Sequence, residues 1–331
     1  MGKTADASTG YEYCSLHELM AGWISLLEKS AASQYADDAE HLFFNAAAGN
    51  THPTESAICY LKQDNAFYLT GGDNGDTSDK HQTRYRYSPV HKEAAVCCVP
   101  NAGRIVPHYI QHMWMKDNNS LVASLLGPSE VHTTINNKEV HVKEETTYPY
   151  ENTLRFTINS NQPNTFSVKI RKPGWAVSVQ SSLPYKEENG YMVYRQVWDK
   201  QTDLTISFQA TIVKKETANK EIYFQNGPLV LCHEIKEDQE ITKKFSVPGL
   251  FESSYKPVQL TIYHYDNDEV KPELNQNNRY KIWMVNSSTG KKEEISLVPM
   301  AKTILRQVTF KTKETDYTKY VNTFIGTEGT G

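Results

Sequence analysis

The sequence of 331 residues has few cysteines and no long apolar run. It contains five cysteines, an odd number without any C-x-x-C pair, which argues against a disulfide-stabilised scaffold. No stretch approaches the roughly 18 consecutive apolar residues of a membrane-spanning helix. The first ten residues, MGKTADASTG, contain no apolar segment of the signal-peptide type. We therefore expect a globular chain that does not act in a membrane.

Common ligand-binding and catalytic motifs are also missing. HELMA and HEIKE lack the second histidine of a zinc-protease helix, and TGGDNG and FIGTEGTG lack the glycine spacing of a dinucleotide-binding loop. No G-x-S-x-G nucleophile motif occurs. The 35 basic and 39 acidic residues give a net charge of −4 and are scattered along the chain. This pattern argues against nucleic acid as the main partner.

The N-terminal third is expected to be helical. Apolar residues recur at helical spacing in 12–48: Leu16, Leu19, Met20, Trp23, Leu26 and Leu27. A further helix is expected from Cys98 to about Met115. Pro100 fits its first turn, whereas Pro107 predicts a kink or a break.

After about residue 120 the chain becomes rich in short β-type runs. In TFSVKIRKP, Phe166, Val168 and Ile170 alternate with Ser167, Lys169 and Arg171, which is the pattern of a half-buried antiparallel strand. Turn signals about every ten residues favour sandwiches or barrels. The chain is therefore expected to be α+β and multidomain: a helical segment over 1–119, β-sandwiches over 120–215 and 216–312, and a tail over 313–331.

Two cysteines, Cys97 and Cys98, are adjacent in the segment AAVCCVPNAGR. Neighbouring Cα atoms are about 3.8 Å apart, which is too close for an ordinary disulfide. With Glu12 and Cys14 from GYEYC they would supply three sulfurs and one oxygen, a possible tetrahedral zinc set. Spacing alone leaves this open, because the two pairs are more than eighty residues apart and buried, unreactive cysteines are common.

Several segments together resemble glycoside hydrolase family 127, the β-L-arabinofuranosidases. They are TGYEYCSLHELM, AEHLFFNAAAGNTHPTESAICYLKQDN, YSPVHKEAAVCCVPNAGRI, KIRKPGWA and NGPLVL, and the similarity runs from about residue 9 to 310. The resemblance implies a retaining glycosidase with an (α/α)₆ barrel followed by β-sandwich domains. It also implies a Zn²⁺ cofactor held by Glu12, Cys14, Cys97 and Cys98, with Cys97 as the catalytic nucleophile, and an L-arabinofuranoside-type glycan as the carbohydrate partner.

The sequence departs from this family at its N-terminal end. The family's general acid is a glutamate that lies shortly before the counterpart of Glu12, yet the only acidic residue before Glu12 is Asp6, in a different context. About 120 residues also hold only the C-terminal part of a twelve-helix barrel. We therefore expect an N-terminally truncated member, with an apolar barrel face open to association. Any export signal would lie upstream, which leaves periplasmic and cytoplasmic locations in a bacterium open.

Three functional hypotheses from different classes follow. The first is the C-terminal part of a zinc-dependent glycoside hydrolase with a cysteine nucleophile. This part would be inactive or weakly active alone, because the acid/base glutamate lies upstream. The second is an inactive remnant whose sandwiches bind carbohydrate or another chain; a purely structural zinc module is a third. The last dozen residues, YVNTFIGTEGTG, resemble the opening strand of family 92 α-mannosidases, with a plain polar tail as the alternative.

Overall fold

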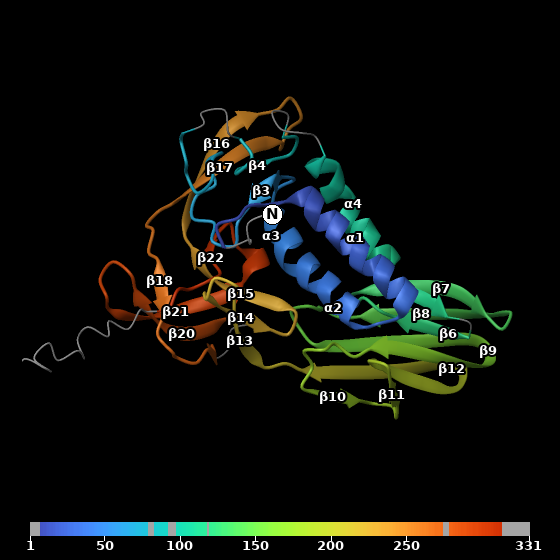
Figure 1. The fold of residues 1–331 in the computed structure, drawn as a ribbon. Helices are drawn as coiled ribbons and strands as arrows, with labels where there is room; N and C mark the ends of the chain where they lie inside the picture. The colour runs from blue at the N-terminus through green and yellow to red at the C-terminus, as the bar shows by residue number, and fades with distance from the viewer. Residues whose placement is uncertain (1–6, 79–82, 92–96, 118, 274–277, 313–331) are drawn as a thin grey trace, which may run out of the picture.

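The computed structural model describes residues 7–78, 83–91, 97–117, 119–273 and 278–312 and is mostly β-structure with a smaller helical part (Figure 1). The helices are α1 (Tyr13–Ser30), α2 (Gln34–His41), α3 (Ala48–Asn50) and α4 (Cys98–Gln111), with a π-helical turn over Leu42–Ala47 and a 3₁₀ turn over Met300–Lys302. The predicted tail, 313–331, lies outside the described residues. The four domain ranges stay a prediction.

Helix α1 forms where the apolar spacing predicts a helix. Its buried aliphatic side chains recur every three or four residues: Leu16, Met20, Ile24 and Leu27. The helix ends at Ser30, and Ala31 takes a left-handed conformation (φ 55°) and donates its backbone N–H to the Leu27 carbonyl at 2.8 Å. The helices expected within 12–48 are confirmed.

Helix α4 begins at the second residue of the cysteine pair. Pro100 lies in its first turn as predicted, where its missing N–H costs no intrahelical bond. The helix does not break at Pro107, because only one backbone bond is lost there and the buried side chains of Ile105 and Tyr109 hold both flanking turns against the core. It ends at Gln111, earlier than expected.

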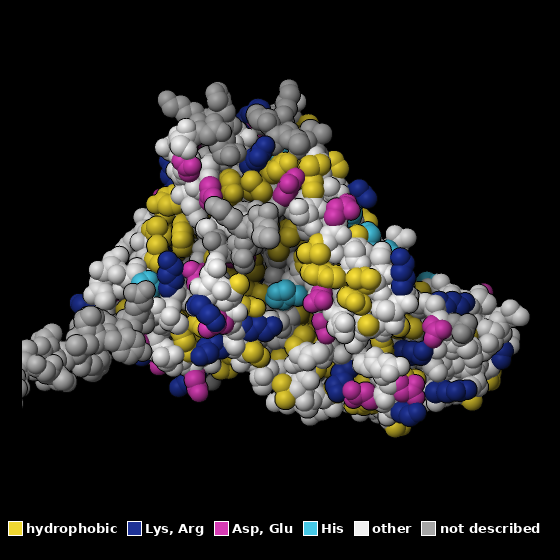
Figure 2. All heavy atoms as spheres, viewed as in Figure 1, with side chains coloured by type: hydrophobic (Ala, Val, Ile, Leu, Met, Phe, Trp, Pro, Cys, Tyr) yellow, Lys and Arg dark blue, Asp and Glu magenta, His cyan; other side chains and the backbone are white. Residues whose placement is uncertain are grey.

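Four apolar side chains of α1 and α4 face solvent. Leu19 and Leu26 on α1 are 48% and 45% exposed, and Val106 and Ile110 on α4 are 46% and 59% exposed. Figure 2 shows apolar side chains gathered over the helical part of the molecule. This is the kind of surface that an incomplete helical barrel would leave open. Association through it stays a prediction.

The first large sheet contains eight strands in the order β10-β12-β9-β6-β5, with β11 paired to β12 and the β7–β8 hairpin joined to β9 through β8. The strands are β5 (Trp114–Asp117), β6 (Ser120–Ala123), β7 (Ser129–Ile135), β8 (Lys138–Glu145), β9 (Thr153–Arg171), β10 (Ser178–Ser181), β11 (Lys186–Glu188) and β12 (Tyr191–Gln209). The predicted alternation in β9 is confirmed for Phe166, Val168 and Ile170, which are buried in one core with Trp198. Pairing is antiparallel except between β6 and β9, which are parallel.

The second large sheet has the order β13-β14-β15-β21-β20-β18, with β19 paired to β20 and β22 to β15. Its strands are β13 (Ile212–Glu216), β14 (Ile222–Asn226), β15 (Leu229–Ile235), β18 (Tyr263–Tyr265), β19 (Lys271–Pro272), β20 (Tyr280–Asn286), β21 (Lys292–Pro299) and β22 (Leu305–Gln307). The predicted β-character of the chain after residue 120 is therefore confirmed.

A smaller sheet joins the N-terminal and C-terminal thirds of the chain. Its order is β16-β17-β4-β2, and it combines β16 (Glu237–Lys244) and β17 (Phe251–Pro257) with β4 (Tyr87–Ser88) and β2 (Ile58–Cys59). Two-residue strands β1 (Tyr11–Glu12) and β3 (Leu61–Lys62) pair next to it at the start of α1. The pairing of β1 with β3 therefore holds the residues just before α1 against the residues that follow α3.

Candidate metal centre

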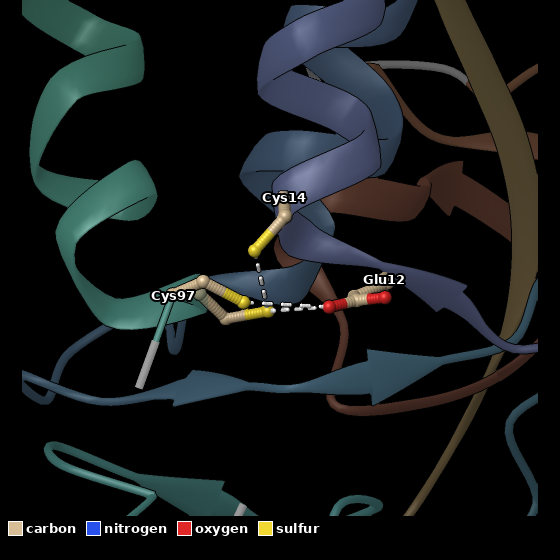
Figure 3. Close-up of side chains that lie close together, drawn as sticks. Glu12, Cys14 and Cys97 are labelled. Atoms are coloured by element: carbon tan, nitrogen blue, oxygen red, sulfur yellow. Dashed lines mark hydrogen bonds between the residues drawn. The ribbon is translucent and has the colours of Figure 1, made fainter. Parts of the chain in front are cut away.

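The N-terminal ends of α1 and α4 converge on one point. Glu12 is the last residue of β1 and immediately precedes α1, and Cys14 lies in the first turn of that helix. Cys97 immediately precedes α4 and Cys98 is its first residue. The side chains of Glu12, Cys14 and Cys97 point toward one another in Figure 3. The two helices bring together segments that are more than eighty residues apart in the sequence because they share one buried cluster, which includes Met20 and Ile105.

The four predicted ligand residues form a compact group. Their sulfur and carboxylate oxygen atoms all lie within 4.8 Å of one another. The Sγ atoms of Cys14 and Cys98 are 3.2 Å apart, and Oε1 of Glu12 lies 3.5 Å from Cys97 Sγ and 3.7 Å from Cys98 Sγ. The arrangement therefore offers three thiols and one carboxylate to a shared centre.

Exposure distinguishes the two adjacent cysteines. Cys98 is buried, whereas Cys97 is exposed. Both Sγ atoms lie near Glu12, but of the pair it is Cys97 whose side chain an external molecule can approach.

Tyr60 is a member of this site that the sequence did not indicate. Its hydroxyl donates to Oε1 of Glu12 at 2.7 Å and lies 3.8 Å from Sγ of Cys97. Its backbone carbonyl accepts the N–H of Tyr13 at 3.2 Å, which fixes the residue against the first turn of α1. The hydrogen bond from Tyr60 lowers the pKa of Glu12, so this carboxylate is ionised at neutral pH.

Two of the thiols, unlike Glu12, favour the neutral form when no cation is near. Burial, followed by the neighbouring sulfurs, raises the pKa of Cys14 and of Cys98. A divalent cation reverses this preference, because metal-bound thiols are deprotonated. Three sulfurs and one oxygen within reach of one another are a donor set that Zn²⁺ accepts in tetrahedral coordination. The residues present therefore fit the expected ion.

A family model matches part of the chain. Residues 120–210 match the model described as "Beta-L-arabinofuranosidase, GH127 middle domain". This range corresponds to strands β6 to β12 of the first large sheet. No curated protein sequence matches the chain.

Solved structures show the same fold. One described as "Glycoside hydrolase" has a TM-score of 0.70 at 16% identity, and the match covers 94% of this chain and 54% of that one. A GH127 beta-L-arabinofuranosidase from Geobacillus stearothermophilus T6 has a TM-score of 0.63 at 17% identity, covering 94% and 51%. A further GH127 beta-arabinofuranosidase has a TM-score of 0.64 at 15% identity, also covering 94% and 51%. The chain thus spans about half the length of these structures.

None of the helices in the described part of the chain combines the length and apolarity needed to cross a membrane.

Proposed function

We propose that the chain carries the nucleophile and metal ligands of a retaining, β-L-arabinofuranosidase-like glycosidase. The proposal rests on the Glu12–Cys14–Cys97–Cys98 group and on the chain's membership of glycoside hydrolase family 127 through residues 120–210. The observation that carries the proposal is the convergence of three thiols and one carboxylate at two helix N-termini. In this proposal the helices are part of an (α/α)₆ barrel, and the substrate is an L-arabinofuranoside-type glycan.

Glu12, Cys14, Cys97 and Cys98 would hold the proposed Zn²⁺. When bound, the ion would supply the charge that keeps the thiols ionised at neutral pH, for Cys14 and Cys98 against the effect of their burial. Tyr60 would hold the Glu12 carboxylate in position through its 2.7 Å hydrogen bond. Such supporting partners usually matter for metal affinity almost as much as the ligands.

Cys97 would act as the nucleophile because it is the more exposed of the two adjacent cysteines. Its sulfur would form a bond to the anomeric carbon while the bond from that carbon to the departing oxygen breaks. A water molecule would then attack the same carbon, release Cys97 as a thiolate and lose a proton. Two displacements at one carbon retain its configuration, as in glycosidases that use a carboxylate nucleophile.

Glu12 is unsuited to protonate the departing oxygen. Its pKa is lowered, chiefly by the hydrogen bond from Tyr60, so at neutral pH it has no proton to donate. It is also the single carboxylate in this group of described residues. The proposal therefore takes the general acid from outside the group, as the family resemblance implies, and expects weak or no activity on substrates with poor leaving groups.

Metal content tests the ligand assignment. We expect about one Zn²⁺ per chain in protein purified with a reductant, and Cys98→Ser is expected to lower the occupancy strongly because it removes a buried ligand. The measurement is elemental analysis after dialysis. Cys59→Ser provides a matched control, since Cys59 is buried outside the group. Absence of metal from the unaltered protein, or equal occupancy in Cys98→Ser, would contradict the assignment.

Removing the Tyr60 hydroxyl tests its supporting role. In Tyr60→Phe the ring stays in place while Glu12 loses its hydrogen-bond donor. We expect the zinc affinity to fall by about 10-fold to 100-fold, as for other partners of metal ligands. Competition with a chromophoric chelator measures this change. Tyr194→Phe is a suitable control, because Tyr194 is buried in the core of the first large sheet, where its hydroxyl lies 3.0 Å from the Ser181 hydroxyl and outside the metal-ligand group. An unchanged affinity in Tyr60→Phe would show that the hydroxyl does not support the ligand.

A further inference from the structure

The β7–β8 hairpin carries a second group of side chains with metal-binding atoms. Glu130, His132 and His141 offer one carboxylate oxygen and two imidazole nitrogens that all lie within 4.8 Å of one another. We propose that these three residues bind a divalent transition-metal ion, such as Ni²⁺ or Zn²⁺, through Nε2 of each histidine and a carboxylate oxygen of Glu130. This site is separate from the thiol-containing group and does not depend on the proposed glycosidase function.

The strand register places the two histidines side by side. His132 on β7 and His141 on β8 are directly opposite in an antiparallel pair. Directly opposite side chains lie on the same face of a sheet, close enough to interact. The two rings are stacked, with centroids 4.1 Å apart and an angle of 8° between their planes. The neighbouring pair, Val131 and Val142, packs into the core, which anchors the hairpin from its other face.

Glu130 completes the group from the same face of β7. Its Oε1 accepts hydrogen bonds from Nε2 of His141 at 2.7 Å and from Nε2 of His132 at 3.2 Å. Both imidazoles therefore present the same nitrogen to one point beside the carboxylate. Lys143 lies directly opposite Glu130 but its ammonium pairs with Glu145 at 2.7 Å. The Glu130 carboxylate thus stays directed at the histidines.

The donor set selects the class of ion. Two imidazoles and one carboxylate suit Zn²⁺, Ni²⁺ and Cu²⁺, whereas Mg²⁺ and Ca²⁺ prefer oxygen ligands. On binding, each imidazole would carry its proton on Nδ1 and coordinate through Nε2. His132 and His141 also line a groove of about 700 Å³ together with Lys200 and Gln201, so water can occupy the remaining coordination positions. With three ligands at an exposed surface, this site is expected to be weaker than the four-ligand centre.

Calorimetric titration of the full chain with Ni²⁺ and with Zn²⁺ at pH 7.5 tests the proposal. The unaltered chain is expected to show two classes of site. The double variant His132→Gln/His141→Gln should lose the weaker class, with affinity reduced at least about tenfold, since loss of ligands costs no less than loss of their supporting partners. The double variant Cys14→Ser/Cys98→Ser should keep that class, so failure of the thiol centre and failure of this site are distinguishable.

Two further variants sharpen the test. His264→Gln removes a histidine on β18, outside the group, and should leave both classes unchanged. Glu130→Gln keeps the shape of the side chain but removes its charge. It should lower the metal affinity of the same class of site that the double histidine variant loses. The proposal is overturned if the double histidine variant binds Ni²⁺ as tightly as the unaltered chain, or if Mg²⁺ binds this site as tightly as Ni²⁺.

Discussion

Replacing Cys97 by serine is expected to abolish the release of dinitrophenolate from 2,4-dinitrophenyl β-L-arabinofuranoside by this chain. Dinitrophenolate is a weak base that departs without protonation, so this substrate isolates the nucleophile from the general acid. If Cys97 Sγ attacks the anomeric carbon, the unaltered chain should release up to one equivalent of dinitrophenolate as a burst, followed by slower turnover. A serine hydroxyl at neutral pH is a far weaker nucleophile, and we expect a rate loss of more than about a thousandfold.

The controls separate chemistry from folding. Cys232 is buried beside Thr303, with its Sγ 3.6 Å from the Thr303 hydroxyl, so Cys232→Ser alters a cysteine without touching the site. It should keep the burst. Methyl β-L-arabinofuranoside, whose departing methoxide needs a proton, should be hydrolysed very slowly because Glu12 is not a proton donor. A burst of equal size and rate in Cys97→Ser would disprove the assigned nucleophile, and no burst in the unaltered chain would support the inactive alternative.

The sequence predicts those features that depend on local spacing. The burial of Leu16 and Met20 in α1 and of Phe166 and Val168 in β9 follows from periodicities of 3.6 and 2 residues. The pairing of β4 with β17 could not be predicted in this way. Strand β4 is two residues long in the N-terminal segment, and β17 lies more than 160 residues further along the chain.

The site was predicted only because of a family resemblance. Cys14 and Cys98 are 84 residues apart, and their contact depends on how α1 packs against α4, which spacing does not reveal. Tyr60 was missed for the same reason. Its position depends on the pairing of β1 with β3, each only two residues long, and a tyrosine in an apolar run is not distinguishable from a core residue.

Arg171 shows where the alternation rule fails. The pattern in β9 assigns Arg171 to the polar side together with Lys169, yet its side chain is fully buried. It lies at the end of β9, where helix α2 covers the sheet, and it forms ion pairs with Asp37 and Glu40 of that helix. The strand pattern carries no information about a helix that packs on its last residue.

These contacts make Arg171→Met the substitution with the largest expected effect on stability. The change keeps a long side chain but leaves the buried Glu40 carboxylate without its cation, and breaking a buried pair in this way costs about 3–5 kcal/mol. Urea unfolding followed by circular dichroism should show the loss. Lys169→Met is the matched control two residues away on the same strand. Its ammonium pairs with the exposed carboxylate of Asp117 at 2.8 Å, so its removal should cost at most about 1 kcal/mol.

A second substitution distinguishes loss of charge balance from loss of packing. Glu40 also accepts hydrogen bonds from the Leu126 N–H on Oε1 at 2.8 Å and from the Tyr148 hydroxyl on Oε2 at 2.5 Å. In Glu40→Gln the amide oxygen can still accept from the Leu126 N–H, and the amide NH₂ can donate to the Tyr148 hydroxyl, which also accepts hydrogen bonds. Arg171→Met combined with Glu40→Gln should therefore recover part of the stability lost in Arg171→Met, because no unpaired charge remains on Glu40. If the double variant is no more stable than the single one, the loss comes from packing. Arg171 then joins α2 to the sheet by its shape and not by its charge.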